Sequence, residues 1–484
     1  MYKPFMFLAA AILFLTAAIV SSSSTNSIIW WGRSKLVEKI SVGQTQEVEL
    51  VFTSRKNFGE VNLSVSNSLN KFISSFEPAT LEVIKDQPNK INVLINVPLD
   101  VSSDTYGGTI HIKEGKRTIG KPLAVNIIVI PTQDPIPPTL PSWSLPVNIS
   151  NSTITSYKPK VLQDESGNVY ALWLDSDFTS QYKLYFSKLE DEVWSSPKSI
   201  ISSDKNNPLY DFDFTIDSQN QIHLVYTQTA AGEGYLVYYT FFDGINWSSP
   251  KKVYQGSSPS IEVGPDNRIH IVYSSFSDIF YSNFDGTFWS SPLNVSDDDL
   301  YGDYTSGAKA IKIDQLGNIH IAWAKYNFGI MYTKFDGKIW ETPQLISKLV
   351  LGLDNTYWLS LGANGVVAVA YTQGPNDCVN QEIYFTLSED GGLSWYSPIQ
   401  ISETPGVGSR WSSLSIVSAN NIQAIWGECQ TGVPFRLFNG TSWSDIIDIG
   451  NGVQKAELPN ISADENKSYA VWGSNNEVYF NQSK

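Results

Sequence analysis

The chain has 484 residues, which is too long for one ordinary domain and predicts two or three domains. Its formal net charge of −15 gives an acidic surface that repels phosphate backbones, so nucleic acid is excluded as an expected partner. Aromatic residues make up 13% of the chain and include 15 tryptophans, which indicates a repeat that places tryptophan in register.

The N-terminal segment, residues 1–25, is predicted to direct export. Lys3 precedes an apolar run over residues 5–20, which only one threonine interrupts. A run of this length is typical of a signal peptide and short for a membrane span; an uncleaved N-terminal anchor is the alternative. Either way we expect a secreted or cell-surface protein. Sequences of the form Asn-x-Ser/Thr, consistent with a glycoprotein, begin at Asn62, Asn148, Asn151, Asn246, Asn294, Asn439, Asn460, Asn466 and Asn481.

Residues 28–130 alternate apolar and polar residues in short runs that are separated by turn sequences. This period of two predicts about seven strands and favours a β-sandwich, which resembles the immunoglobulin-like spacer modules of surface proteins. Residues 131–141 contain five prolines, so we expect an extended, semi-rigid linker there.

Residues 142–484 contain an internal repeat. One unit is a short apolar strand that ends in an aromatic residue, at Trp173, Tyr226, Tyr273, Trp323, Tyr371, Trp426 and Trp472. The other is a turn followed by tryptophan, most often Phe-Asp-Gly-x-x-Trp, and it ends at Trp194, Trp247, Trp289, Trp340, Trp395 and Trp443. The chain stops after its seventh aromatic strand without a seventh turn unit, whereas Trp143 has the tryptophan tail without the preceding strands.

These units predict a seven-bladed β-propeller of four-stranded blades. The segment at Trp143 is expected to supply the outer strand of the last blade, so that the N- and C-terminal strands of the propeller close the ring in one sheet and remove an open edge. The expected fold class is therefore all-β, with an immunoglobulin-like sandwich followed by a propeller.

One turn carries the complete pattern Ser-x-Asp-x-Gly-x-x-Trp, formed by Ser388, Asp390, Gly392 and Trp395. This pattern matches the Asp-box of bacterial-neuraminidase (BNR) repeats, and the chain from Trp143 onward resembles the sialidase-like propeller superfamily. The resemblance implies a structural role for the box, in which the Asp caps a tight turn and the Trp packs between blades, on the face opposite the usual ligand site.

The resemblance also defines what a sialidase would need. Sialidases of this family hold the substrate carboxylate with three arginines, because a guanidinium pairs with a carboxylate through two hydrogen bonds. The propeller segment contains only Arg268, Arg410 and Arg436, and only Arg410 stands where an inner strand begins at the ligand face. A triad is not evident, so enzymatic activity is uncertain and we lean towards none.

The expected ligand face is formed by the loops that enter the inner strands and leave the second strands. The ligand-binding candidates there are Trp358, Trp411, Arg410, Tyr304, Asp175 and Glu428, near Tyr157, Tyr210, Asp177 and Gln228. Aromatic rings beside carboxylates and amides suit sugar rings, although Trp358 and Trp411 could instead fill the funnel between blades. Asp303, Glu428 and Arg410 are the candidates for catalysis, with Asp303 and Glu428 as a hydrolytic pair.

Asp297, Asp298 and Asp299, together with Asp303, lie in one loop on this face and are candidates for Ca²⁺ binding; a solvated acidic loop is the alternative. We expect no other cofactor. His223, His270 and His320 occupy equivalent positions in three blades, where the rotation between blades keeps them from converging. Cys378 and Cys429 follow the second strands of neighbouring blades, and a disulfide between them is expected in an exported protein.

The favoured hypothesis is a non-catalytic recognition protein that binds a glycan or a surface protein through the propeller funnel. It has no expected nucleic-acid partner and contacts a membrane only through an uncleaved N-terminal segment. The alternatives are a sialidase-like glycoside hydrolase or lyase that uses funnel carboxylates, and a structural surface-layer component.

Overall fold

The computed structural model describes residues 28–130, 138–296, 305–325, 328–348 and 359–484, except Ser34, Asn376, Pro405, Thr431 and Gln454. Within these residues the regular secondary structure is β-strand, apart from one short 3₁₀ turn, η1 (Asn67–Leu69). The prediction of an all-β fold is therefore confirmed. Among the described residues, no helix has the length and apolar character needed to span a membrane. The predicted export segment lies outside the described residues, as do residues 131–137 of the predicted linker.

The N-terminal part forms two facing sheets. One sheet has the order β1 (Ile29–Trp31), β3 (Thr45–Ser54), β7 (Asn89–Asn96), β5 (Ile73–Glu77). The other has the order β2 (Lys35–Ser41), β9 (Arg117–Ile130), β8 (Thr105–Glu114), β4 (Phe58–Val65), β6 (Thr80–Val83). Alternate residues of these strands, such as Val48, Leu50 and Phe52 of β3, are buried in one shared core, as the period-two pattern predicts.

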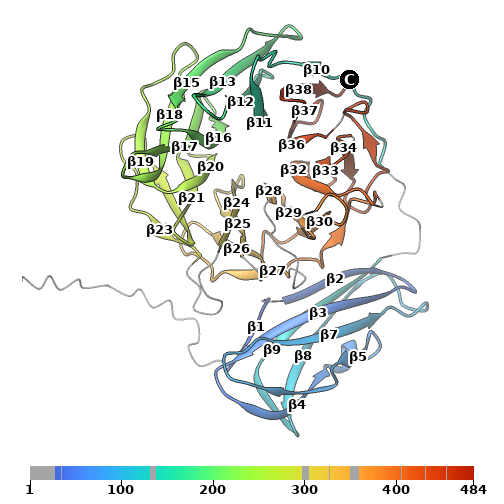
Figure 1. Ribbon diagram of the computed structural model, residues 1–484. Coiled ribbons are helices and arrows are strands. Elements are labelled where there is room, and N and C mark those ends of the chain that lie inside the picture. Colours follow the sequence, from blue (N-terminus) through green and yellow to red (C-terminus); the bar gives the residue numbers. More distant parts are fainter. Residues whose placement is uncertain are drawn as a thin grey trace, which may run out of the picture.

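The C-terminal part is a ring of sheets around a central axis, a β-propeller (Figure 1). The described residues form seven such sheets, which we number as blades 1 to 7 from the sheet of β11. The strands nearest the axis are β11 (Thr155–Gln163), β16 (Leu209–Ile216), β20 (Ser257–Val263), β24 (Thr305–Ile313), β28 (Leu359–Asn364), β32 (Ser409–Ser418) and β36 (Glu457–Ala463).

The second strands are β12 (Val169–Ser176), β17 (Ile222–Ala230), β21 (Ile269–Ser275), β25 (Ile319–Lys325), β29 (Val366–Gln373), β33 (Asn421–Glu428) and β37 (Ser468–Ser474). They are apolar runs because neighbouring blades cover both of their faces, and Trp173, Trp323, Trp426 and Trp472 are fully buried there. The third strands are β13 (Gln181–Glu190), β18 (Gly234–Phe242), β22 (Asp278–Phe284), β26 (Gly329–Phe335), β30 (Glu382–Ser388), β34 (Pro434–Phe438) and β38 (Glu477–Gln482).

The outer strands are short. They are β14 (Val193–Trp194), β15 (Lys198–Asp204), β19 (Lys251–Gln255), β23 (Leu293–Asn294), β27 (Gln344–Lys348), β31 (Ile399–Gln400), β35 (Ile447–Asp448) and β10 (Val147–Asn148). Blade 1 has five strands rather than the predicted four, because both β14 and β15 pair with the long strand β13. In five other blades the place of β14 holds only a single bridge, such as that from Phe242 to Trp247.

The ring is closed by strands from both ends of its sequence. Strand β10 pairs antiparallel with β38, with Val147 opposite Phe480, and Trp143 forms a bridge with Ser483. The Trp143 ring also packs edge-on against Phe435 of blade 6, with ring centroids 5.2 Å apart. The prediction that the segment at Trp143 shares a sheet with the final strand is confirmed.

Candidate ligand-binding face

The axis of the ring contains a cavity of about 340 Å³. Charged side chains from neighbouring inner strands pair within it: Lys160 Nζ lies 2.7 Å from Asp213 Oδ1, Lys158 Nζ lies 3.6 Å from Asp211 Oδ1, and Lys312 pairs with Glu262. Burial lowers the pKa of Lys309, whose Nζ donates to Ser274 Oγ at 2.7 Å, to about 7. The cavity is therefore polar, and most of its charge is paired.

A repeated β-bulge shapes one mouth of this cavity. Inner strands of six blades shift register near their first residues. In four of these blades φ lies between +50° and +58° at the shift, at Lys158, Ser258, Trp411 and Leu458. The left-handed backbone at Trp411 is thus part of the repeat and is not by itself a mark of a functional site.

Aromatic side chains gather at this mouth over blades 1 and 2. Tyr157 and Phe178 have ring centroids 5.5 Å apart, and Tyr210 and Tyr235 have centroids 5.1 Å apart. Tyr182 of β13 packs against the same core cluster as Tyr157, between blades 1 and 2. We call these five residues the aromatic rim. Phe178, Tyr235 and Tyr210 are 58%, 47% and 41% exposed, so three rings face solvent.

Polar groups border the rim. Asp175 is buried, which raises its pKa, and its Oδ2 accepts a hydrogen bond from Ser152 Oγ at 2.7 Å. Its Oδ1 has no hydrogen-bond partner among the described residues. Lys158 Nζ donates to the backbone oxygen of Tyr210 at 2.7 Å. The mouth therefore offers flat apolar surface beside a buried carboxyl and a lysine.

Asp177 was expected on the ligand face, and in the structure its carboxylate stabilises a turn. Its Oδ1 accepts backbone hydrogen bonds from Thr179, Ser180 and Gln181 at 2.7–3.1 Å. The hydroxyl of Ser180 and these N–H groups lower the pKa of Asp177. Asp177 thus holds the turn that presents Phe178.

A second cluster lies at the same end of blades 5 and 6. Glu428 is 2% exposed, and its Oε1 accepts from Thr404 Oγ1 (3.0 Å), Trp426 Nε1 (3.1 Å) and Ser409 Oγ (3.2 Å). Its Oε2 has no partner among the described residues, and burial raises the pKa of this carboxyl. A buried, poorly ionised carboxylic acid could donate a proton to a ligand.

The neighbours of Glu428 are packed rather than open. Trp411 is half-buried over Gly427, where an added Cβ would lie 3.1 Å from the indole. Arg410 lies over the Trp411 ring, with Cζ 5.7 Å from its centroid, and burial lowers the pKa of Arg410. The disulfide expected between Cys378 and Cys429 is present and joins the loops of blades 5 and 6, with Cα atoms 5.4 Å apart.

Six of the predicted site residues lie outside the described residues: Asp297, Asp298, Asp299, Asp303, Tyr304 and Trp358. The three arginines lie apart: Arg268 faces Asp266, Arg436 donates to the backbone oxygen of Ser444, and Arg410 is in the Glu428 cluster. In the part of the chain that the structure describes, no three His, Cys, Asp or Glu side chains are arranged to hold a metal ion.

The three histidines do not converge. His223 is hydrogen-bonded to Tyr239 (2.8 Å) and Asp217 (3.1 Å), both in its own blade. His270 and His320 bond to Tyr281 and Tyr332 in the same way, at 2.8 and 2.6 Å. Burial lowers the pKa of all three imidazoles, so they act as neutral hydrogen-bonding groups inside the blades.

No protein-family model matches the chain, and no curated protein matches it by sequence.

Solved structures share a similar arrangement of strands. The NanB sialidase from Streptococcus pneumoniae is 12% identical, with a TM-score of 0.40 over 91% of this chain and 95% of that chain. An ulvan lyase from a new family of polysaccharide lyases is 12% identical, with a TM-score of 0.48 over 69% and 95%. The SapL1 lectin, solved with α-methyl fucoside, is 15% identical, with a TM-score of 0.41 over 62% and 98%. Identities and TM-scores this low indicate nothing about the activity of this chain.

Sequence reasoning missed three residues of the aromatic rim: Phe178, Tyr182 and Tyr235. Phe178 and Tyr235 follow second strands and enter third strands, as the recognised candidates Asp177 and Gln228 do. Both therefore lie within a few residues of positions that the sequence already places on the ligand face. Tyr182 carries the same signal, because it is the second residue of β13 as Tyr235 is of β18.

Proposed function

We propose that the protein is a non-catalytic recognition module that binds a glycan across the aromatic rim. The observation that carries this proposal is the gathering of five aromatic residues at the mouth of the axial cavity. Four of them form two contacting pairs, and three of them are 41–58% exposed. The C–H face of a sugar packs well on such rings, and its hydroxyls suit Asp175 and Lys158.

We further infer the finer description of the molecule. The ring of sheets is a seven-bladed sialidase-like propeller, the two-sheet unit is an immunoglobulin-like spacer, and the Ser388–Trp395 turn is an Asp-box. The protein acts outside the cytoplasm, either secreted or at the cell surface. Supporting this are the seven sheets of the ring, the hydrogen bonds of Asp390 within its turn, and the disulfide.

The test is a glycan array, followed by calorimetric titration of the best ligand. Phe178→Ala and Tyr210→Ala should each weaken binding about tenfold, the loss expected for removing one stacked ring. Phe288→Ala is the matched control, because Phe288 is 73% exposed in a turn at the opposite end of its blade. Equal affinities for the three variants, or no glycan bound at all, would rule the proposal out.

The Glu428 cluster supports one alternative, a glycoside hydrolase or lyase in which Glu428 acts as the acid. The unpartnered Oε2 and the raised pKa of this buried carboxyl favour it. Turnover of a chromogenic glycoside that is lost in Glu428→Gln, with the Phe178→Ala variant still active, would establish this alternative.

A further inference from the structure

The sandwich packs against the outer edge of the ring at blades 4 and 5, beside β27 (Figure 1). Glu38 of β2 is 1% exposed and takes part in this contact. Its Oε1 accepts a hydrogen bond from Ser397 Oγ of the ring at 2.7 Å, and its Oε2 accepts one from Gln46 Nε2 at 2.9 Å. Lys348 of β27 pairs with Glu49 of β3 at 2.8 Å. These polar contacts fix how the two units meet.

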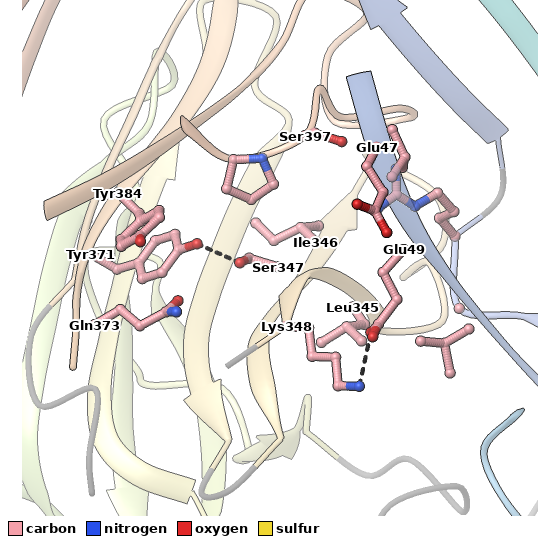
Figure 2. Close-up of a pocket in the computed structure, with 15 residues that line it drawn as sticks. Glu47, Glu49, Leu345, Ile346, Ser347, Lys348, Tyr371, Gln373, Tyr384 and Ser397 are labelled. Atoms are coloured by element: carbon pink, nitrogen blue, oxygen red, sulfur yellow. Dashed lines mark hydrogen bonds and ion pairs between the residues drawn. The ribbon is translucent and has the colours of Figure 1, made fainter. Parts of the chain in front are cut away.

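A cavity of about 260 Å³ lies within this contact, and we call it the junction pocket (Figure 2). Glu47 and Glu49 form the wall on the side of the sandwich, since both point outward from β3. Tyr371, Gln373 and Tyr384 of blade 5 form the facing wall. The pocket therefore exists only where the two units meet, and it is close to the roughly 300 Å³ at which small-molecule sites begin.

The charges that line the junction pocket balance. Two acids, Glu47 and Glu49, face two bases, Arg33 and Lys348, and Lys348 is already paired with Glu49. Arg33 Nη1 lies 3.7 Å from Glu38 Oε1. A charged ligand would bring an uncompensated charge into a partly desolvated space, which is costly. The pocket therefore favours a neutral ligand.

The junction pocket also has hydrogen-bonding capacity to offer. Arg33 Nη1 is buried and has no hydrogen-bond partner among the described residues. Glu47 uses Oε1 to accept from Asn92 Nδ2 at 2.7 Å, and Gln373 presents an amide from the other wall. Apolar surface is supplied by Val51, Pro398 and the Tyr384 ring. A ligand that fits must donate and accept hydrogen bonds around an apolar face.

We propose that the junction pocket binds one neutral sugar residue, held between Glu47 and Arg33 of the sandwich and Gln373 and Tyr384 of the ring. A hexose has hydroxyls that donate to carboxylates and accept from a guanidinium, and a C–H face that packs on a tyrosine ring. This site is separate from the aromatic rim, and the proposal does not rest on glycan binding there.

The test titrates the full chain with neutral methyl glycosides of glucose, galactose, mannose and N-acetylglucosamine at millimolar concentrations. Binding is followed by calorimetry and by crystal soaking. At least one glycoside should bind saturably, and Glu47→Ala and Gln373→Ala should each weaken it about tenfold. Glu47 is exposed on its strand, so its removal leaves the sandwich core intact. Glucuronide and glucosamine glycosides should bind at least tenfold more weakly than their neutral counterparts.

Variants at the two sites separate this proposal from the proposed function. Tyr210→Ala should leave binding at the junction pocket unchanged, and Glu47→Ala should leave binding at the aromatic rim unchanged. The proposal fails if none of the neutral glycosides binds saturably. It also fails if binding is insensitive to both junction variants, or if the charged glycosides bind as well as the neutral ones.

Discussion

At the scale of single residues, Gly392 is the most constrained position in the turns between third and outer strands. Its φ is +91°, and an added Cβ would lie 1.9 Å from the hydroxyl oxygen of Tyr332. The same turn is fastened by Asp390, whose Oδ1 accepts from the Ser394 N–H at 2.8 Å, and by Trp395, which packs edge-on against Tyr332. The glycine is therefore required by both the backbone and the neighbouring blade.

Gly392→Ala should destabilise the fold by about 3 kcal/mol, because left-handed strain is added to a clash in a packed interior. Gly244→Ala is the matched control: its φ is +95°, but nothing lies within 4 Å of the added Cβ. The control should cost only about 1 kcal/mol, from strain alone. Urea unfolding of both variants checks the difference, and equal losses of stability would contradict this reading of the turn.

Residue-scale features of the turns could be predicted from sequence because they are local. The carboxylates of Asp243, Asp285 and Asp336 accept N–H groups only two and three residues ahead, so a short motif contains the whole interaction. The buried contact of Glu38 with Ser397 could not be predicted in this way, because 359 positions separate the two residues.

At the scale of elements, ring closure depends on the two-residue strand β10. It adds the outer strand of blade 7, and its neighbour Ser150 donates to Glu477 while accepting from the Val478 N–H at 2.9 Å. Ser152 extends this connection, since its N–H donates to Glu477 at 3.0 Å and its hydroxyl to Asp175. The segment thus links blade 7 to blade 1 as well as completing a sheet.

Replacing residues 143–150 with a flexible Gly/Ser segment of the same length should sharply lower the melting temperature of the ring. The replacement exposes the edge of β38 and removes the Trp143 contact with Phe435. Circular dichroism melts of the variant and the parent chain provide the measurement. An unchanged melting temperature would show that β10 is dispensable for closure.

The strands of the ring could be predicted from the sequence because the repeat contains many copies of the aromatic strand and of the tryptophan turn. The seventh tryptophan unit, displaced to Trp143, was enough to predict the pairing of β10 with β38. The aromatic rim was only partly predictable, from Tyr157 and Tyr210. Which rings touch across two blades depends on strand twist and loop path, and the repeat does not encode these.

At the scale of the whole molecule, the docking of the sandwich on the ring buries Glu38 beside Arg33, Gln46 and Ser397. Burial raises the pKa of Glu38 above its usual value of 4.5, against the opposing effect of Arg33. The folded, docked protein therefore keeps the Glu38 proton to a higher pH than the unfolded chain does. The junction pocket belongs to this scale too, and sequence could not predict it because it arises only from docking.

Stability should fall as the pH rises from about 4.5 through the raised pKa of Glu38, because in that window the folded state binds more protons than the unfolded state. Glu38→Gln keeps the shape of the side chain and one acceptor oxygen but cannot ionise, so its stability should depend less on pH over the same window. Melting temperatures of both proteins across the acidic range test this. Parallel pH profiles would mean that Glu38 does not couple protonation to stability.

The sandwich contacts the ring at blades 4 and 5, whereas the aromatic rim lies on blades 1 and 2, on the far side of the ring in Figure 1. An occupant of one site therefore leaves the other accessible. If both proposed sites bind sugars, a branched polysaccharide whose ends span the ring would bind the second site intramolecularly once it is held at the first. Its overall avidity could then exceed either single affinity by about 100- to 10,000-fold, so two weak sites on one chain would suffice for tight retention on a polymer.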